Sequence, residues 1–117
     1  MNIKLLRQVK RQILKEPRQF CMDNWFLTIG DAKWKIPNCG TAACIGGWAI
    51  SLSSKLSPSE AQYSNKTPYQ VLEVTNSQGV RLFYESNWPE RFISSYGTTR
   101  LQKAKKAALR IEHFIKT

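Results

Sequence analysis

The sequence has few acidic residues and very little histidine. Its 117 residues include 8 Asp and Glu against 18 Lys and Arg, with a single histidine and a formal net charge of +10. No two of the carboxylates stand at a helical spacing that suggests an acid–base pair, and no glycine-rich loop is followed by the Lys and Ser or Thr that would hold a phosphate. The composition therefore gives little support to small-molecule catalysis, and no cofactor is expected.

A long apolar run is also missing. No stretch approaches the roughly 20 apolar residues that a transmembrane helix needs. The cations Lys4, Arg7, Lys10 and Arg11 interrupt residues 1–14, where a secretory signal would require an apolar core. The three cysteines are an odd number and do not suggest a disulfide framework. We therefore expect a cytoplasmic protein with reduced thiols and no membrane partner.

The length and the charge excess narrow the class of protein. A chain of 117 residues predicts one domain, residues 1–117, which can bury a core without disulfides or metals. A net charge of +10 predicts attraction to polyanions, first of all nucleic acid or a nucleoprotein complex. An acidic protein surface is the second interpretation. A basic exterior that serves only solubility is the third.

Both ends of the chain have the pattern of amphipathic helices. Residues 3–16 place apolar side chains at i, i+3 and i+7, and Pro17 predicts the end of that helix. A final helix is predicted from about Thr99 to Lys116. Its expected core face is Leu101, Ala104, Ala108, Ile111 and Ile115. We expect the two helices to pack side by side, so that their basic stripes would form one positive strip.

The middle of the chain predicts shorter elements. Thr41 is the expected N-cap of a buried helix from Ala42 to about Leu56, in which two glycines allow a close backbone approach. Further helix starts are expected at Ser57-Pro58, at Thr67-Pro68 and at Pro89. Gln78-Gly79 is expected to be a turn, followed by a strand or apolar loop at Val80, Leu82 and Phe83.

The fold expected from these patterns is mainly α-helical. Five or six short helices would form a compact single-domain bundle. Residues 26–36 allow two interpretations, a small β-hairpin around Gly30-Asp31 or an irregular loop, because Trp34 and Ile36 alternate with lysines.

The expected binding residues are the basic stripes of the terminal helices and one exposed aromatic residue. Cations at this spacing can follow a phosphate backbone or an acidic groove. The candidates are Lys4, Arg7, Arg11, Lys15, Trp34, Arg100, Lys103, Lys106 and Arg110. Arg81 and Arg91 would extend the surface. No helix-turn-helix is evident, so sequence-specific recognition of bases is not predicted.

A thiol hydrolase is the alternative with the most specific residues. Cys44 would lie in the first turn of the central helix, where the helix dipole lowers a thiol pKa, and His113 is the available imidazole base. The helical position of His113 argues against this pair, because it lies with Lys106 and Arg110, opposite the expected core stripe. Cys21, Cys39, Cys44 and His113 would also make a Cys₃His set, but their spacing is not that of a zinc site, so no metal is expected.

The sequence resembles a scattered group of small, uncharacterised bacterial and phage-encoded proteins. Two motifs carry most of the resemblance: Cys39-Gly40-Thr41-x-x-Cys44-Ile45-x-Gly47-Trp48-Ala49 and Arg110-Ile111-Glu112-His113-Phe114-Ile115. The resemblance spans most of the chain and implies no catalytic activity. It implies an accessory or anti-defence role, by analogy alone.

Overall fold

The computed structural model describes residues 1–20, 26–27, 42–56, 58–61, 64–93 and 99–117. These residues form six α-helices with short 3₁₀ turns between them, and the chain is mainly helical as the sequence predicts. The helices are α1 (Ile3–Lys15), α2 (Ile45–Ser54), α3 (Pro58–Ala61), α4 (Pro68–Leu72), α5 (Asn76–Phe83) and α6 (Arg100–Lys116). The 3₁₀ turns are η1 (Pro17–Gln19), η3 (Glu85–Asn87) and η4 (Glu90–Phe92).

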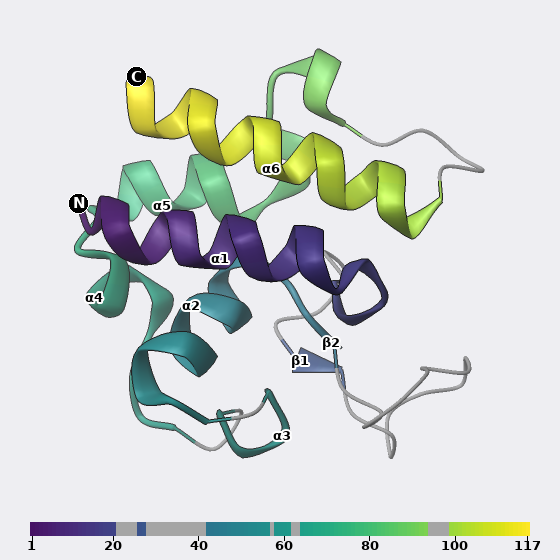
Figure 1. Cartoon of the computed structure of the whole chain (residues 1–117). Helices are drawn as coiled ribbons and strands as arrows, with labels where there is room; N and C mark the ends of the chain where they lie inside the picture. Colours follow the sequence, from purple (N-terminus) through teal and green to yellow (C-terminus); the bar gives the residue numbers. More distant parts are fainter. Residues whose placement is uncertain (21–25, 28–41, 57, 62–63, 94–98) are drawn as a thin grey trace.

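The two long terminal helices, α1 and α6, run antiparallel and side by side, so that both chain ends lie at one end of the molecule (Figure 1). This packing confirms the arrangement expected from their apolar stripes. Leu6, Val9 and Ile13 of α1 are fully buried, as are Ala104 and Ile111 of α6. The apolar stripes of both helices therefore meet in the core, and each helix leaves its outer face to solvent.

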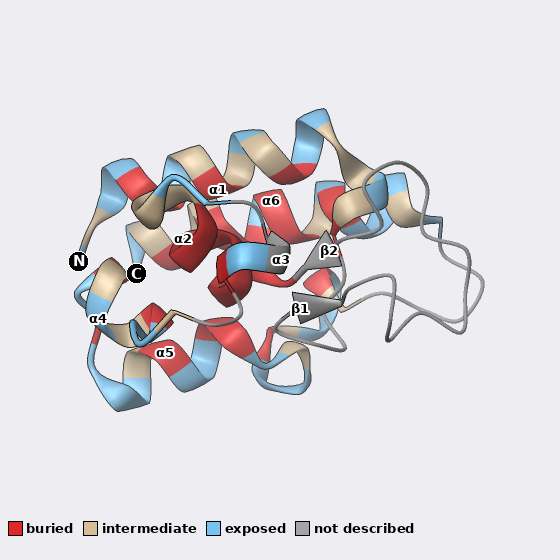
Figure 2. Cartoon of the chain, turned by 90° about the horizontal axis from the view of Figure 1, so that it is seen from below, coloured by how far each residue is buried: buried red, intermediate tan, exposed pale blue. Residues whose placement is uncertain are grey.

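The central helix α2 lies beneath α1 and is buried along most of its length (Figure 2). It begins at Ile45 rather than at the predicted Ala42, because Cys44 is the N-cap and its Sγ accepts a hydrogen bond from the Gly47 N–H at 3.4 Å. The helix ends at Ser54, where Lys55 takes the left-handed conformation. The predicted start at Ala42 is wrong, because the backbone of Ala42 pairs with another segment.

That partner is a two-residue strand. β1 (Phe26–Leu27) pairs antiparallel with β2 (Ala42–Ala43), so Ala42 and Ala43 are extended rather than helical. Part of the 26–36 segment is thus a strand, but its partner lies beyond the predicted hairpin. The expected turn at Gly30-Asp31 and the side chain of Trp34 fall outside the described residues.

The predicted helix starts at Thr67-Pro68 and near Thr99 are confirmed. Each threonine hydroxyl accepts from the N–H of the third helical residue, Gln70 or Gln102, whose side chain accepts from the threonine N–H in return. The turn predicted at Gln78-Gly79 is wrong. Thr75 and Gln78 form a third capping box of the same kind, and α5 runs through both residues and on through Val80 to Phe83.

Candidate functional site

The exposed side of α1 carries four cations. Lys4, Arg7, Arg11 and Lys15 are all exposed, as the helical spacing predicts, and we call these four residues the α1 basic face. The opposite side of α1 is the buried stripe described above. Because the helix is anchored by that stripe, the four cations are presented to solvent on one rigid scaffold.

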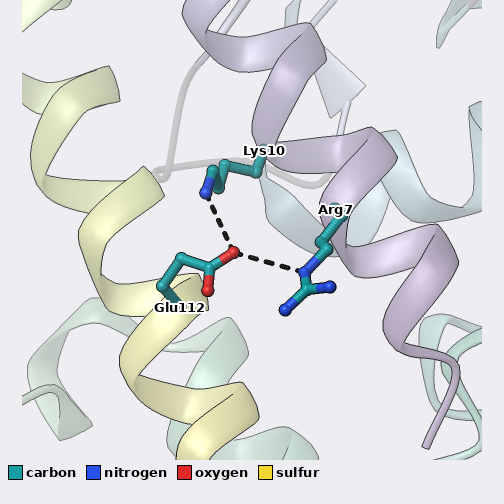
Figure 3. Close-up of polar contacts among 3 residues, drawn as sticks. All are labelled: Arg7, Lys10 and Glu112. Carbon is teal, nitrogen blue, oxygen red and sulfur yellow. Dashed lines mark hydrogen bonds and ion pairs between the residues drawn. The ribbon is translucent and has the colours of Figure 1, made fainter.

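A shallow, open hollow adjoins this face where α1 meets α6. Its volume is about 480 Å³, and Arg7, Lys10, Arg11 and Glu112 line it. Lys10 Nζ lies 2.9 Å from Glu112 Oε1, and Arg7 Nε lies 3.5 Å from the same oxygen (Figure 3). The carboxylate therefore contacts two cations, and because Arg11 also lines the hollow, the lining residues together keep a positive charge.

Glu112 is held in its ionised form by these neighbours. The hydrogen bond from Lys10 is the largest influence that lowers the pKa of the Glu112 carboxyl, and the charges of Lys10, Arg7 and Lys116 lower it further. Arg7 remains half-exposed, so its contact with Glu112 is a weak surface ion pair. An incoming anion would compete with Glu112 for the same two donors, Lys10 and Arg7.

The basic residues predicted on the last helix do not form a matching free face. Lys103 is exposed, but Lys106 Nζ donates to the Ile93 carbonyl at 3.0 Å and an Arg100 Nη donates to the Arg18 carbonyl at 2.6 Å. These two cations fasten α6 to neighbouring backbone. The continuous positive strip expected across both helices is therefore not present in the form predicted.

The prediction for Arg110 is wrong. Expected on a solvated stripe, it is only 4% exposed, whereas Leu101 from the predicted core face is 47% exposed. The core side of α6 is rotated toward α5, and it takes in Ala107 and Phe114, which the sequence pattern did not single out. Arg110 lies at the edge of this buried side.

The structure does not bring Cys44 and His113 into a catalytic pair. Cys44 is buried at the start of α2 and caps that helix. The His113 Nδ1 atom bonds an Arg110 guanidinium nitrogen at 2.9 Å, and its ring packs 5.3 Å from the ring of Phe92. The imidazole of His113 thus contacts Arg110 and Phe92, and neither contact involves a thiol.

Metal binding finds no support among the residues described. Two cysteines of the Cys₃His set, Cys21 and Cys39, lie outside them. Within the described ranges, no three His, Cys, Asp or Glu side chains gather closely enough to hold a metal ion.

Two residues of the hollow, Lys10 and Glu112, were not among the predicted site residues. Lys10 follows Arg7 by three positions, so the helical period alone would place it beside Arg7. Glu112 had no comparable signal, because its contact with α1 joins residues 102 positions apart.

Comparisons with protein-family models, with curated proteins and with solved structures give no match for this chain. Across the helices that the structure describes, none is both long enough and apolar enough to span a bilayer.

Proposed function

We propose that the protein is a non-enzymatic binding protein whose α1 basic face engages the phosphate backbone of a nucleic acid, free or within a nucleoprotein complex. The observation that carries the proposal is the set of four exposed cations on α1 beside a hollow lined by three cations and one carboxylate. The net charge of +10 supplies the long-range attraction. A cytoplasmic location belongs to the same proposal.

The dimensions of α1 suit a phosphate backbone. Lys4 and Lys15 are eleven positions apart, which corresponds to about 16 Å along a helix. Phosphates of one strand follow each other at about 3.4 Å along a duplex axis while the strand winds around it, so a straight face of this length can reach a few neighbouring phosphates. In the hollow, a phosphate oxygen would take the place of the Glu112 carboxylate at Lys10. Such contacts carry no information on base sequence, so we expect binding with little sequence preference.

Fluorescence anisotropy with a labelled 20-mer DNA or RNA tests the proposal. Arg7→Glu/Arg11→Glu should weaken binding on the order of tenfold or more, and the affinity of the unchanged protein should fall steeply with salt. The matched control is Lys55→Glu/Lys66→Glu, which makes the same change in net charge at exposed positions outside α1. Thermal melting should show all variants folded, because exposed substitutions usually change stability by about 0.5 kcal/mol or less.

Two results would reject the nucleic-acid proposal. One is the absence of binding to DNA and RNA at low salt. The other is an equal loss in the α1 variant and in the control, which would mean that overall charge alone drives the association.

An acidic protein surface is the second candidate, and one feature favours it. Ile3 and Leu14, both about 40% exposed, lie on the outer side of α1 among its cations. A partner with apolar and acidic residues would use both kinds of side chain. This candidate takes precedence if the α1 face binds no nucleic acid. The accessory or anti-defence role implied by the resemblance remains a prediction with either partner.

The thiol-hydrolase alternative is tested by alkylation. Cys44 is 3% exposed, so it should react slowly in the native protein and quickly only after unfolding. Fast labelling of native Cys44 near neutral pH would reopen that alternative.

A further inference from the structure

A stack of cationic and aromatic side chains lies on the α5 side of α6, away from α1. The Arg91 guanidinium carbon lies 4.6 Å from the centre of the Phe92 ring, and the Phe92 ring lies 5.3 Å from the His113 ring. His113 in turn contacts Arg110 at 2.9 Å. Arg81 joins the group through its backbone carbonyl, which accepts from the second Arg110 guanidinium nitrogen at 3.1 Å. We call Arg81, Arg91, Arg110 and His113 the Arg110 cluster.

Arg110 is a buried cation that lacks a counterion in the described part of the chain. It forms no ion pair there, and its Nε atom is buried without a hydrogen-bond partner. Its compensating contacts are one carbonyl, one imidazole and the face of the Phe114 ring, 5.6 Å from the guanidinium carbon. Burial of a charge without an opposite charge is costly, so an arrangement of this kind favours an anion close by.

The neighbouring charges increase this imbalance. Burial lowers the pKa of the Arg110 guanidinium most, and repulsion from Arg81 and Arg91 lowers it further. Burial also lowers the pKa of the His113 imidazole, with Arg110 and Arg91 as the next causes. In both shifts burial is the largest cause, and repulsion between neighbouring cations adds to it, so the positive charges of the cluster are not balanced by each other's contacts.

The contact with Arg110 also fixes the tautomer of His113. Arginine has only donors, so His113 Nδ1 must accept, and the proton of the neutral ring stands on Nε2. The half-buried imidazole therefore offers an N–H, and the exposed side chains of Arg81 and Arg91 offer further donors. The surrounding elements carry further charged groups. These are Glu85 on η3, Glu90 on η4, and Arg100, Lys103, Lys105, Lys106, Glu112 and Lys116 on α6.

We propose that the Arg110 cluster is a second anion site, in which Arg81, Arg91 and the His113 Nε2–H bind the oxygens of a phosphate group above the buried Arg110. Arginine forks fit phosphate oxygens well, and Arg110 adds a fixed positive field through a medium of low dielectric. The bound phosphate supplies the counterion that Arg110 lacks. The site is separate from the α1 basic face and does not depend on the function proposed for it.

Two sources share this ligand chemistry: a free phosphate or phosphomonoester, and a phosphodiester of nucleic acid. His113 is the single histidine of the chain, so its imidazole NMR signals give an unambiguous titration. The experiment measures the pKa of His113 in chloride, in inorganic phosphate and in dimethyl phosphate at equal ionic strength. A bound anion stabilises the imidazolium, so the pKa of His113 should rise by about one pH unit.

A rise in inorganic phosphate alone would assign the site to free phosphate or monoesters, whereas a rise with both anions would include the nucleic-acid backbone. Arg81→Gln/Arg91→Gln should abolish the anion-dependent rise, and Lys55→Gln/Lys66→Gln should retain it. All four substitutions are at exposed positions, so the fold should be kept.

A pKa of His113 that is the same in all three salts would overturn the proposal. A rise that persists in the Arg81→Gln/Arg91→Gln variant would overturn it as well, because the anion would then act without the cluster. Neither result bears on oligonucleotide binding at the α1 face, which is measured with different variants.

Discussion

Gly79 lies inside α5 at a point where no side chain fits. A Cβ atom placed on it would lie 2.3 Å from Tyr69 Cε1, 2.6 Å from Tyr69 Cδ1 and 2.9 Å from Phe83 Cε2. Carbon atoms in contact prefer about 3.5–4.0 Å, so Gly79→Ala must push the Tyr69 ring outward by about 1 Å or more. That ring now makes an edge-to-face contact with Phe83, with centroids 5.1 Å apart.

Three effects decide the magnitude for Gly79→Ala. Alanine in a helix interior gains about 1 kcal/mol over glycine. Overpacking costs about 1–3 kcal/mol, and loss of the aromatic pair costs about 0.5–1.5 kcal/mol. The free energy of unfolding should therefore fall by about 0.5–3.5 kcal/mol.

Urea denaturation checks this value, because a change in stability alone lowers the midpoint and leaves the slope unchanged. The control is the same substitution in a Tyr69→Ala background, where the ring is gone and Gly79→Ala should be neutral or stabilising. If Gly79→Ala stabilises the protein with Tyr69 in place, the close contact is not what selects glycine at this position.

Four further predictions concern Glu112, His113 and Gly47. Glu112→Gln should strengthen nucleic-acid binding severalfold in anisotropy, because it removes the only carboxylate among the described lining residues of the hollow and leaves Lys10 for phosphate. The same variant should lose part of the acid destabilisation of the protein, since the folded pKa of Glu112 lies below its ordinary 4.5 and its ion pairs are lost as pH falls through that lower value. The pKa of His113 in the folded protein also lies below its ordinary 6.5, so the unfolded chain binds the proton first as pH falls. The free energy of unfolding should therefore decline as pH falls below about 6.5. Urea titrations at pH 5 and 7 should show a smaller difference in stability for His113→Gln. Gly47→Leu should lower the free energy of unfolding by about 1–3 kcal/mol, because Gly47 is buried in α2, and an unchanged melting temperature would contradict that packing.

Local signals in the sequence located several helix ends. Pro17 marks the end of α1, and the threonines at 67 and 99 begin α4 and α6 with capping boxes. These features depend on residues within one turn of each other, so the sequence contains them completely. The same logic would have identified the start of α5 at Thr75, but Gly79 suggested a turn. Only the contact with Tyr69 shows why a glycine stands inside that helix.

The first residue of α2 is set by a strand pairing with a segment distant in the sequence. Thr41 and Ala42 are acceptable as a helix start by local preference, yet Ala42 and Ala43 pair with Phe26 and Leu27. Backbone pairing between residues fifteen and seventeen positions apart overrides a local preference that is worth a fraction of a kcal/mol. Helix α2 therefore begins only after the strand, at the residue that follows Cys44.

For the candidate site, the sequence by itself determined the α1 basic face, because the helical period separates Arg7 and Arg11 from the buried stripe whatever α1 packs against. Tertiary structure alone decided which basic residues of α6 are exposed and which are buried or bound to neighbouring backbone. The rotation of that helix toward α5 buries Arg110, and the antiparallel packing sets Glu112 against Lys10. Periodicity gives the relative positions of side chains around a helix, but which neighbour each one meets depends on how helices distant in the sequence dock to exclude water from the core.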